Sequence, residues 1–319
     1  MSPRDTAEFL ALAAIWGASF LFMRVAAPEF GPLSLMLVRC AVGAATLLPV
    51  LLWYGKGRDL VADAGWILVV GALNSAIPFV LLGVATLTLT AGVTSILNSL
   101  APLWAALIAW VWLGDRLTRA QAFGLVLGAA GVAVLVGGGG GTGAAGRTGT
   151  GTVAAVLLPF AAGILATVFY GIAANLARRF LAGVHPLATA TGSQLSATLV
   201  LLAPGLLTWP DGTAVGGVAG SGFAGVSGTS WLAALVLGVL CTGAAYILFF
   251  RLIANVGATR TVAVTFVIPL FGVGWGALFL GEGIDAATLA GGAIIVLGTA
   301  LTTGALQASA ATRPSPDRG

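Results

Sequence analysis

Charge is the scarcest property of this sequence. Only 8% of its 319 residues are Asp, Glu, Lys or Arg, whereas an ordinary soluble domain has about 25%. Hydrophobic residues make up 59% of the chain, and the mean hydropathy is +1.06. Because a helix needs about 20 mostly apolar residues to cross the ~30 Å hydrocarbon core of a bilayer, this composition excludes an ordinary soluble domain and indicates a polytopic membrane protein.

The residues that build metal, disulfide and proton-transfer sites are also scarce. Cys40 and Cys241 are the only cysteines, and they lie far apart in apolar stretches, so we expect neither a disulfide framework nor a metal site. His185 is the only histidine and falls in a predicted loop. No Asp or Glu lies inside a predicted membrane span, which leaves a carboxylate-based proton relay without support.

Signals for nucleotides and nucleic acids are weak or missing. The segments "GTGAAG" (141–146) and "GSGFAG" (220–225) satisfy G-x-G-x-x-G, but neither follows a strand or opens a soluble helix. The P-loop pattern G-x-x-x-x-G-K-[ST] does not occur. We therefore expect no cofactor and no ATP-driven activity, and the formal net charge of +4 gives no reason to expect a nucleic-acid partner.

What the sequence does have is a series of apolar segments of helical length, separated by short breaks with turn formers and charges. The first apolar run continues to about residue 27, longer than the 7–15 residues usual in a secretory signal, so we expect a retained helix. The candidate helices cover about residues 7–27, 32–53, 64–86, 90–113, 119–137, 152–176, 186–208, 230–253, 259–280 and 286–306.

The distribution of basic residues predicts the orientation. With the N-terminus in the cytoplasm, 11 of the 14 Lys and Arg residues lie on the inner side, as the positive-inside rule requires. The reverse orientation would place nearly all of them outside. We therefore predict a multi-pass protein of the cytoplasmic (inner) membrane with both termini cytoplasmic.

The two halves of the chain repeat each other. "APLWAALIAWVWLGDRLT" and "IPLFGVGWGALFLGEGID" correspond at a shift of 167 residues, and the regions around Trp16 and Tyr170 correspond at a shift of 154. Chance matches among apolar helices explain shared Leu and Ala well, but they explain matched Pro, Gly and acidic positions poorly. The matched positions are Pro102, Gly114 and Asp115 with Pro269, Gly281 and Glu282, and Trp16, Arg24 and Pro32 with Tyr170, Arg178 and Pro186.

Because each half has an odd number of spans, the second half enters the membrane upside down. We predict an all-α integral membrane protein with ten transmembrane helices in two inverted-topology five-helix repeats, an arrangement that in transporters places the site near the midplane. The predicted parts are a first repeat (1–137), a Gly-rich extracytoplasmic linker (138–151), a second repeat (152–306) and a short polar cytoplasmic tail (307–319).

These residues carry a resemblance to a known family. "IWGASFLFMRVAAPEFGPLSLMLVR" (15–39) and the two segments ending in "LGDRLT" and "LGEGID" resemble the EamA branch of the drug/metabolite transporter superfamily over about residues 7–306. Asp115 stands where many relatives have Glu, which keeps the charge. The resemblance implies ten helices, a central cavity lined largely by the third, fourth, eighth and ninth, and traffic of small metabolites, often export.

The expected function is therefore secondary, non-ATP-driven transport. We expect export of a small metabolite, such as an amino acid or related compound, by alternating access between the repeats. The partners are then the metabolite and the lipid bilayer, with monomer and homodimer both open. A lipid flippase and a membrane-embedded enzyme are the alternatives, but the paired acids, activated nucleophile or metal ligands that such an enzyme needs are missing, so we predict no enzyme.

Arg39 is the most informative single residue. It lies seven residues after Pro32, which places it about 10 Å along a helix. A cation at that depth is costly unless it is paired or hydrated, so Arg39 either binds an anionic group such as a carboxylate or is held by backbone carbonyls at helix ends. Arg24 lies nearer a helix end, and we expect it to reach the lipid headgroups.

Polar and aromatic residues recur at equivalent places in the two halves. Their hydrogen-bonding groups can bind a polar metabolite, although Ser, Thr and Asn also hold membrane helices together and Trp favours the membrane interface. The two Gly-x-x-x-Gly patterns, 124–128 and 272–276, we expect to pack within the bundle. The candidate binding residues are Arg39, Asn74, Ser75, Asn98, Tyr246 and Thr265, with Trp16, Trp104 and Tyr170 as walls. The candidate gating residues are the prolines Pro102 and Pro269, as mid-helix hinges, and the acids Asp115 and Glu282.

Overall fold

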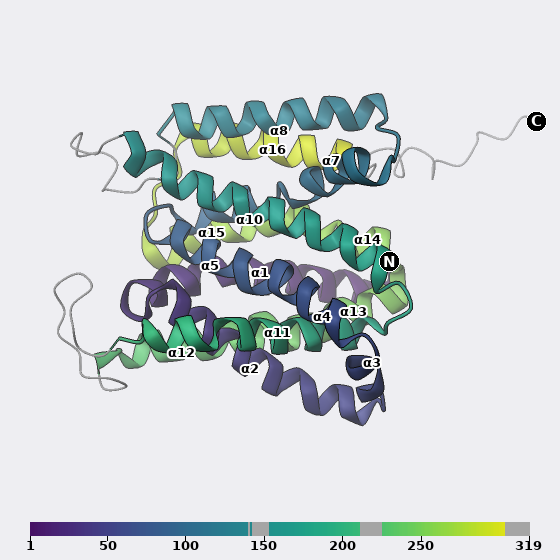
Figure 1. Cartoon of the computed structure of the whole chain (residues 1–319). Coiled ribbons are helices and arrows are strands. Elements are labelled where there is room, and N and C mark those ends of the chain that lie inside the picture. The colour runs from purple at the N-terminus through teal and green to yellow at the C-terminus, as the bar shows by residue number, and fades with distance from the viewer. Residues whose placement is uncertain (140, 142–152, 211–224, 304–319) are drawn as a thin grey trace, which may run out of the picture.

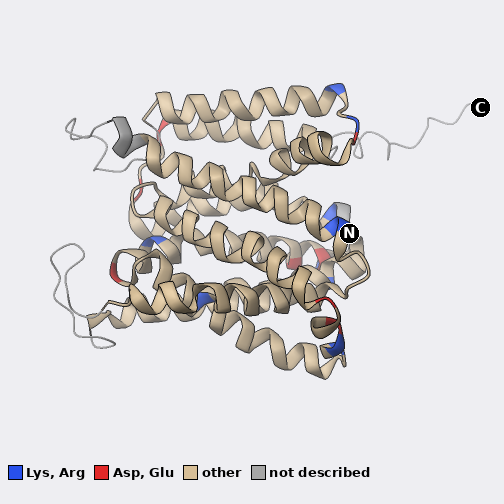
Figure 2. Cartoon of the chain, viewed as in Figure 1, with Lys and Arg blue, Asp and Glu red and all other residues tan. Residues whose placement is uncertain are grey.

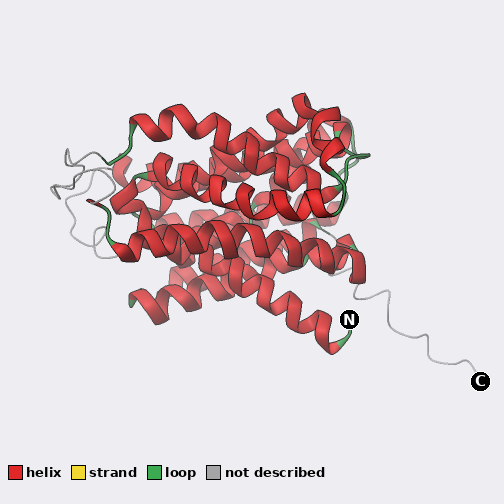
Figure 3. Ribbon diagram, turned by 90° about the horizontal axis from the view of Figure 1, so that it is seen from below, coloured by secondary structure: helices red, strands yellow, loops and turns green. Residues whose placement is uncertain are grey.

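A computed structural model describes residues 1–139, 141, 153–210 and 225–303, and that part of the chain is a bundle of helices without strands (Figures 1 and 3). The helices are α1 (Pro3–Phe30), α2 (Pro32–Trp53), α3 (Gly57–Ala62), α4 (Ala64–Gly71), α5 (Ile77–Thr86), α6 (Ala91–Asn98), α7 (Ala101–Leu113), α8 (Arg119–Gly137), α10 (Val153–Phe180), α11 (Pro186–Leu207), α12 (Gly228–Gly238), α13 (Ala245–Val256), α14 (Ala258–Val262), α15 (Val264–Leu280) and α16 (Ala286–Thr302).

The predicted all-α membrane fold is confirmed. Among the described residues, nine helical stretches are long and apolar enough to cross a membrane, and α16 is a shorter apolar helix of 17 residues. The proposed linker falls almost wholly, and the tail entirely, outside the described residues, so the limits of the four predicted parts stay predictions.

The helices end where the repeated sequence signals lie. Gly114 and Gly281 end α7 and α15 in the left-handed conformation, with φ of 73° and 63°. Glycine adopts this conformation without the steric penalty of a Cβ atom, which explains its place at both helix ends. Pro32 and Pro186 begin α2 and α11, where the missing N–H of proline costs no hydrogen bond.

Two spans contain a feature that the hydropathy pattern does not predict. The span Ala64–Thr86 contains a π-helical turn at Ala72–Ala76, and the span Gly228–Val256 contains one at Val239–Ala244. The two turns begin 167 residues apart, at corresponding positions of the repeats. Such turns are rare and are frequent at functional sites.

The two prolines predicted as mid-helix hinges lie in different surroundings. Pro102 is in the first turn of α7, because the helix is broken at Ser99 and Leu100, so its predicted mid-helix position is wrong and its role as a hinge stays a prediction. A break at this point removes the clash of the proline ring with the preceding turn. The freed carbonyl of Ser99 accepts a hydrogen bond from the Thr299 hydroxyl at 3.0 Å. Pro269 does lie inside a helix, α15.

Small residues bring helices close together. The paired helices α8 and α16 lie at one edge of the bundle (Figure 1). A Cβ atom on Gly124 would collide with the carbonyl oxygen of Gly298, so glycine at this position allows the close approach of the two helices. Gly272 likewise lies directly against Ser95 on α6. Both Gly-x-x-x-Gly patterns therefore pack within the bundle.

Most charged residues lie at the two ends of the bundle, with uncharged helix between them (Figure 2). One end carries Asp115 and the start of α1, and we call it the Asp115 end. The other carries Glu282 and the turn between α5 and α6, and we call it the Glu282 end. The span Ala91–Leu113 connects them, because Glu282 contacts Ala91 and Asp115 follows α7.

Candidate functional site

Arg39 lies in the middle of the bundle with only 5% of its surface exposed. Its Nε donates a hydrogen bond to Oγ1 of Thr242 at 3.2 Å, and its guanidinium carbon lies 4.0 Å from the centre of the Phe79 ring. Its Nη1 is 3.8 Å from the sulfur of Met23. No carboxylate in the described part of the chain forms an ion pair with it.

This environment stabilises the guanidinium only in part. A hydroxyl, an aromatic face and a thioether offer attraction without a negative charge. The contacts come from side chains and not from the backbone carbonyls at helix ends that the structural alternative requires. Arg39 therefore has the surroundings of a cation that can receive an anionic group.

Thr242 owes its position to the π-helical turn between α12 and α13. Its hydroxyl donates to the carbonyl oxygen of Leu237, five residues earlier, at 2.9 Å, and accepts from Arg39. In the first repeat the corresponding residue is Ser75, at a shift of 167 residues, and it accepts a hydrogen bond from Nε2 of Gln194 at 3.2 Å. The two matched turns thus present one hydroxyl each to the centre of the bundle.

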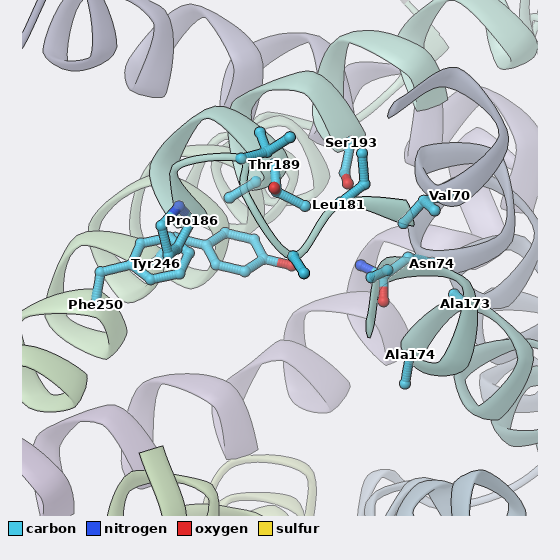
Figure 4. Close-up of a pocket in the computed structure, with 14 residues that line it drawn as sticks. Val70, Asn74, Ala173, Ala174, Leu181, Pro186, Thr189, Ser193, Tyr246 and Phe250 are labelled. Atoms are coloured by element: carbon cyan, nitrogen blue, oxygen red, sulfur yellow. The ribbon is translucent and has the colours of Figure 1, made fainter. Parts of the chain in front are cut away.

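A cavity of about 300 Å³ leads from the Asp115 end toward these residues. Its walls begin at Leu181 and Pro186, near the turn between α10 and α11, and reach Asn74 and Tyr246 (Figure 4). The volume suits a small metabolite, since ligand pockets start at about 300 Å³.

Aromatic side chains pack behind Tyr246, which lines this cavity. Trp16 packs edge-on against Tyr246, with ring centres 6.3 Å apart, and against Phe249 at 5.3 Å. Tyr170 is half-buried and packs against the same apolar cluster as Trp16. The structure thus brings Arg39, Asn74, Ser75 and Tyr246 together with two of the three predicted wall residues.

Three predicted candidates lie elsewhere. Trp104 packs in a second cluster with Leu103. The Thr265 hydroxyl donates to the carbonyl oxygen of Val262. Asn98 ends α6 and is half-buried. None of the three lines the 300 Å³ cavity. For these residues, as for the other candidates, a part in a binding site stays a prediction.

Sequence reasoning missed Thr242 and Gln194. Thr242 could have been found as the counterpart of Ser75 in the aligned segments "NSAIPF" and "CTGAAY". Gln194 is an amide well inside a predicted apolar span, and that was the available signal. Its partner could not be predicted, because hydropathy does not tell which way a buried helix faces.

The Glu282 end carries a packed ion pair. Both carboxylate oxygens of Glu282 accept from the backbone N–H of Ala91 at 3.0 Å, and Arg24 lies 3.7 Å away. Arg24 also donates to the carbonyl oxygen of Thr86 at 2.6 Å, so the expectation that it reaches lipid headgroups is wrong. Burial raises the pKa of Glu282, outweighing the hydrogen bonds from the backbone and the charge of Arg24.

The Asp115 end carries a similar pair in open surroundings. Asp115 and Arg178 are 2.8 Å apart, and both side chains are at least half exposed. They border a second cavity, of about 290 Å³, together with Asn175 and Trp110. By the repeat shifts of 167 and 154, Asp115 corresponds to Glu282 and Arg178 to Arg24.

Comparisons with known proteins match this architecture. A "Probable terminal-alkyne amino-acid exporter" of Streptantibioticus cattleyicolor is 26% identical over 286 residues, covering 90% of this chain and 89% of that protein. An "Uncharacterized transporter YvbV" of Bacillus subtilis is 26% identical over 302 residues, covering 91% and 89%. A solved crystal structure shares the fold, with a TM-score of 0.65 at 19% identity over 100% of both chains.

The family comparison covers both repeats. Residues 7–137 and 157–304 match the EamA-like transporter family. Its members are transporters and not enzymes, in agreement with the predicted absence of catalysis. This chain belongs to the EamA-like transporter family.

Proposed function

We propose that this transporter exports a small carboxylate-bearing metabolite, an amino acid or a related compound, across the cytoplasmic membrane. The observation that carries the proposal is Arg39, a buried guanidinium without a carboxylate partner among the described residues, close to the inner end of a cavity. A carboxylate is the natural partner for a guanidinium, because the two can form a pair of parallel hydrogen bonds.

The direction of transport rests on which end of the bundle is open. The positive-inside rule predicts that the Asp115 end faces the cytoplasm. The cavity leads toward the centre from that end, whereas we infer that the packed ion pair closes the Glu282 end. Loading from the cytoplasm fits this arrangement, and the relative from Streptantibioticus cattleyicolor, named as an amino-acid exporter, supports export.

Release on the other side requires the two ends to exchange roles. Inverted repeats allow this, because each half can adopt the conformation of the other. The matched ion pairs at the two ends support such an exchange. Transport is then by alternating access, with Asp115 and Glu282 setting the balance between the two conformations.

The deciding experiment compares extracellular metabolites of cells that express the wild type, Arg39→Ala, Arg39→Lys or an empty vector. We expect a carboxylate-bearing compound to accumulate with the wild type and to fall by roughly 30-fold or more with Arg39→Ala, since removing one partner of a buried charge contact costs about 2–5 kcal/mol. Arg39→Lys keeps the charge and should retain part of the activity. Membrane abundance is measured in parallel.

Two results would contradict the proposal. If Arg39→Ala exports as well as the wild type, the guanidinium does not bind the substrate. If Arg39→Ala and Arg39→Lys both disappear from the membrane, the guanidinium serves the fold.

The predicted topology is tested separately by reporter fusions. A reporter fused after Gly55 or Arg119 should lie in the cytoplasm. A reporter fused within 138–150 or 210–228 should lie on the outer side of the membrane. The physical reason is the odd number of spans in each half, which puts matched loops on opposite faces. A reversed result for either pair would contradict the inverted-repeat arrangement.

A further inference from the structure

The centre of the bundle has two polar positions related by the repeat. At the shift of 154 residues, Arg39 corresponds to Ser193, so Gln194 is the next residue after the counterpart of Arg39. Each of the two long polar side chains bonds a hydroxyl from the π-helical turn of the opposite repeat. Arg39 bonds Thr242, and Gln194 bonds Ser75. The same arrangement of a long polar side chain and a hydroxyl therefore occurs twice, but the side chain is a charged guanidinium in one case and an uncharged amide in the other.

Gln194 has a hydrogen-bonding atom to spare. It is fully buried, and its Nε2 donates to Ser75. Its carbonyl oxygen Oε1 is buried without a hydrogen-bond partner in the described structure. An unsatisfied buried acceptor is costly, and it is the kind of group that a bound donor would satisfy.

Arg39 and Gln194 lie close enough to contact one small molecule. Gly43 follows Arg39 by one turn on α2, a rise of about 6 Å. A Cβ atom on Gly43 would lie 2.7 Å from Cγ2 of Thr242 and 3.7 Å from Cγ of Gln194. The side chain of Thr242 therefore contacts Arg39 on one side and lies near Gln194 on the other.

The cavity ends beside this pair of residues, and neither of the two lines it. Asn74 and Ser193 line its walls, and they are the direct chain neighbours of Ser75 and Gln194. A molecule that moves inward from the Asp115 end past Tyr246 would meet the guanidinium and the amide just beyond the inner end of this cavity.

We propose that Gln194 binds the ammonium group of a zwitterionic α-amino acid, its Oε1 accepting the hydrogen bond, while Arg39 binds the carboxylate. This inference rests on the proposed function and narrows its substrate class. An α-amino acid carries its two charges on neighbouring carbons, and hydrogen bonds of about 2.9 Å at each end bring its span close to one helical turn.

Charge explains why both ends of the substrate are needed. An amine alone would be repelled by Arg39, and a carboxylate alone would leave Oε1 of Gln194 without a donor. A zwitterion satisfies both groups, because its carboxylate screens the guanidinium from the ammonium. The uncharged amide then distinguishes an amino acid from a plain carboxylic acid.

The test uses the purified full-length protein in detergent and measures binding by thermal stabilisation. The probes are L-alanine, L-valine, L-leucine and L-phenylalanine, each compared with its deaminated acid: propionate, 3-methylbutanoate, 4-methylpentanoate and 3-phenylpropionate. We expect the wild type to bind at least one amino acid about tenfold tighter than its deaminated counterpart, the effect of one charge-assisted hydrogen bond.

Variants assign this preference to the amide. Gln194→Met keeps the length of the side chain, and it should bring the ratio of the two affinities close to one while the deaminated acid binds as before. Gln194→Glu should keep or increase the preference, since a carboxylate also accepts from an ammonium. If Gln194→Met does not fold, Ser75→Ala, which removes the partner of the amide, should lower the ratio in the same direction.

The outcomes separate this inference from the proposed function. If Gln194→Met keeps the full preference for the amino acid, Gln194 does not bind the ammonium group, and the proposed binding of the carboxylate by Arg39 is unaffected. If the wild type binds both members of each pair equally, the proposal of a zwitterionic substrate is wrong, and the proposal of a carboxylate-bearing substrate is unaffected. If it binds none of the eight compounds, the carboxylate substrate is contradicted as well.

Discussion

The two ends of the bundle carry the same charged pair in different surroundings. At the Glu282 end, the side chains of Arg24 and Glu282 are 28% and 12% exposed, and at the Asp115 end those of Arg178 and Asp115 are 56% and 50% exposed. Only Glu282 contacts the start of a facing helix, through the N–H of Ala91. The repeat thus supplies two equivalent acids, of which one is packed.

One neighbouring residue explains much of this difference. A Cβ atom on Gly276 would collide with the carboxylate of Glu282, so glycine leaves the space in which that carboxylate lies. The corresponding residue at the Asp115 end is Ala109, which carries a Cβ atom at the matched position. The comparison teaches that a matched repeat can be made asymmetric by one methyl group and one shorter acid, which favours closure of the Glu282 end.

Replacing the packed acid should have the largest effect. Glu282→Ala removes the acceptor of the Ala91 N–H and the partner of Arg24. We therefore expect the conformation in which the Glu282 end is closed to be destabilised by about 1.5–3 kcal/mol relative to the open one, which shifts the equilibrium between them roughly 10–100-fold. Cys40 and Cys241 are buried and are the direct chain neighbours of Arg39 and Thr242, so they serve as natural probes. Their alkylation by an impermeant maleimide added outside intact cells should accelerate by a similar factor.

An unchanged alkylation rate in Glu282→Ala would show that this end is closed by other contacts. Binding of the substrate should change less than the rate of transport, because Glu282 is far from the central site. Unchanged kinetics in both Glu282→Ala and Asp115→Ala would contradict their role in the conformational balance.

Removing the space for the acid should have a smaller effect. Gly276→Ala puts a methyl group where the Glu282 carboxylate lies, and the side chain can partly move aside, so we expect alkylation to accelerate about 3–10-fold, an overpacking cost of about 1 kcal/mol. Gly274→Ala is the matched control, because Gly274 lies on the same helix and a Cβ atom added there would meet nothing within 4 Å. Equal rates in the two variants would contradict the role of Gly276.

The exposed pair should matter less. Asp115→Ala removes an ion pair of a kind worth about 0–1 kcal/mol, so we expect the transport rate to change at most about fivefold, and the change to shrink at high salt. A control, Asp59→Ala, removes an acid elsewhere on the same face. If Asp115→Ala changes the transport rate as much as Glu282→Ala does, the two acids contribute equally, which would contradict the inferred difference between the two ends.

The effect of external pH on the alkylation rate should be the smallest of these effects. The packed arrangement raises the pKa of Glu282 above that of an exposed carboxylate, so it binds a proton more tightly than the open arrangement, and lowering the external pH should favour closure. Alkylation from outside, normalised to unfolded protein at each pH, should slow about two- to threefold between about pH 7 and pH 5 in the wild type. Glu282→Gln should flatten this dependence.

The sequence predicted the framework of this molecule well. Long apolar runs, a proline at the start of α2 and α11, and glycine at the ends of α7 and α15 are local signals, and each determines a helix or its end. The matched acids Asp115 and Glu282 also lie at opposite ends of the bundle, as the alignment of the halves requires. These features depend on neighbours in sequence and need no knowledge of packing.

The contacts in the centre could not be predicted in the same way. The pairing of Arg39 with Thr242 and of Gln194 with Ser75 depends on how far each helix is turned about its axis. In a membrane helix that is apolar on all sides, hydropathy contains little information on that rotation. The break before Pro102 and the bond of Arg24 to Thr86 were missed for a related reason, since each depends on a partner distant in sequence.

The matched π-helical turns also record the history of the chain. A π-helical turn accommodates one residue more than the regular helix around it, which is how a single inserted residue is absorbed without unfolding the span. Turns at Ala72–Ala76 and Val239–Ala244 occupy corresponding positions of the two repeats. Two independent insertions at one register are a far less economical explanation than one insertion in a half-length ancestor.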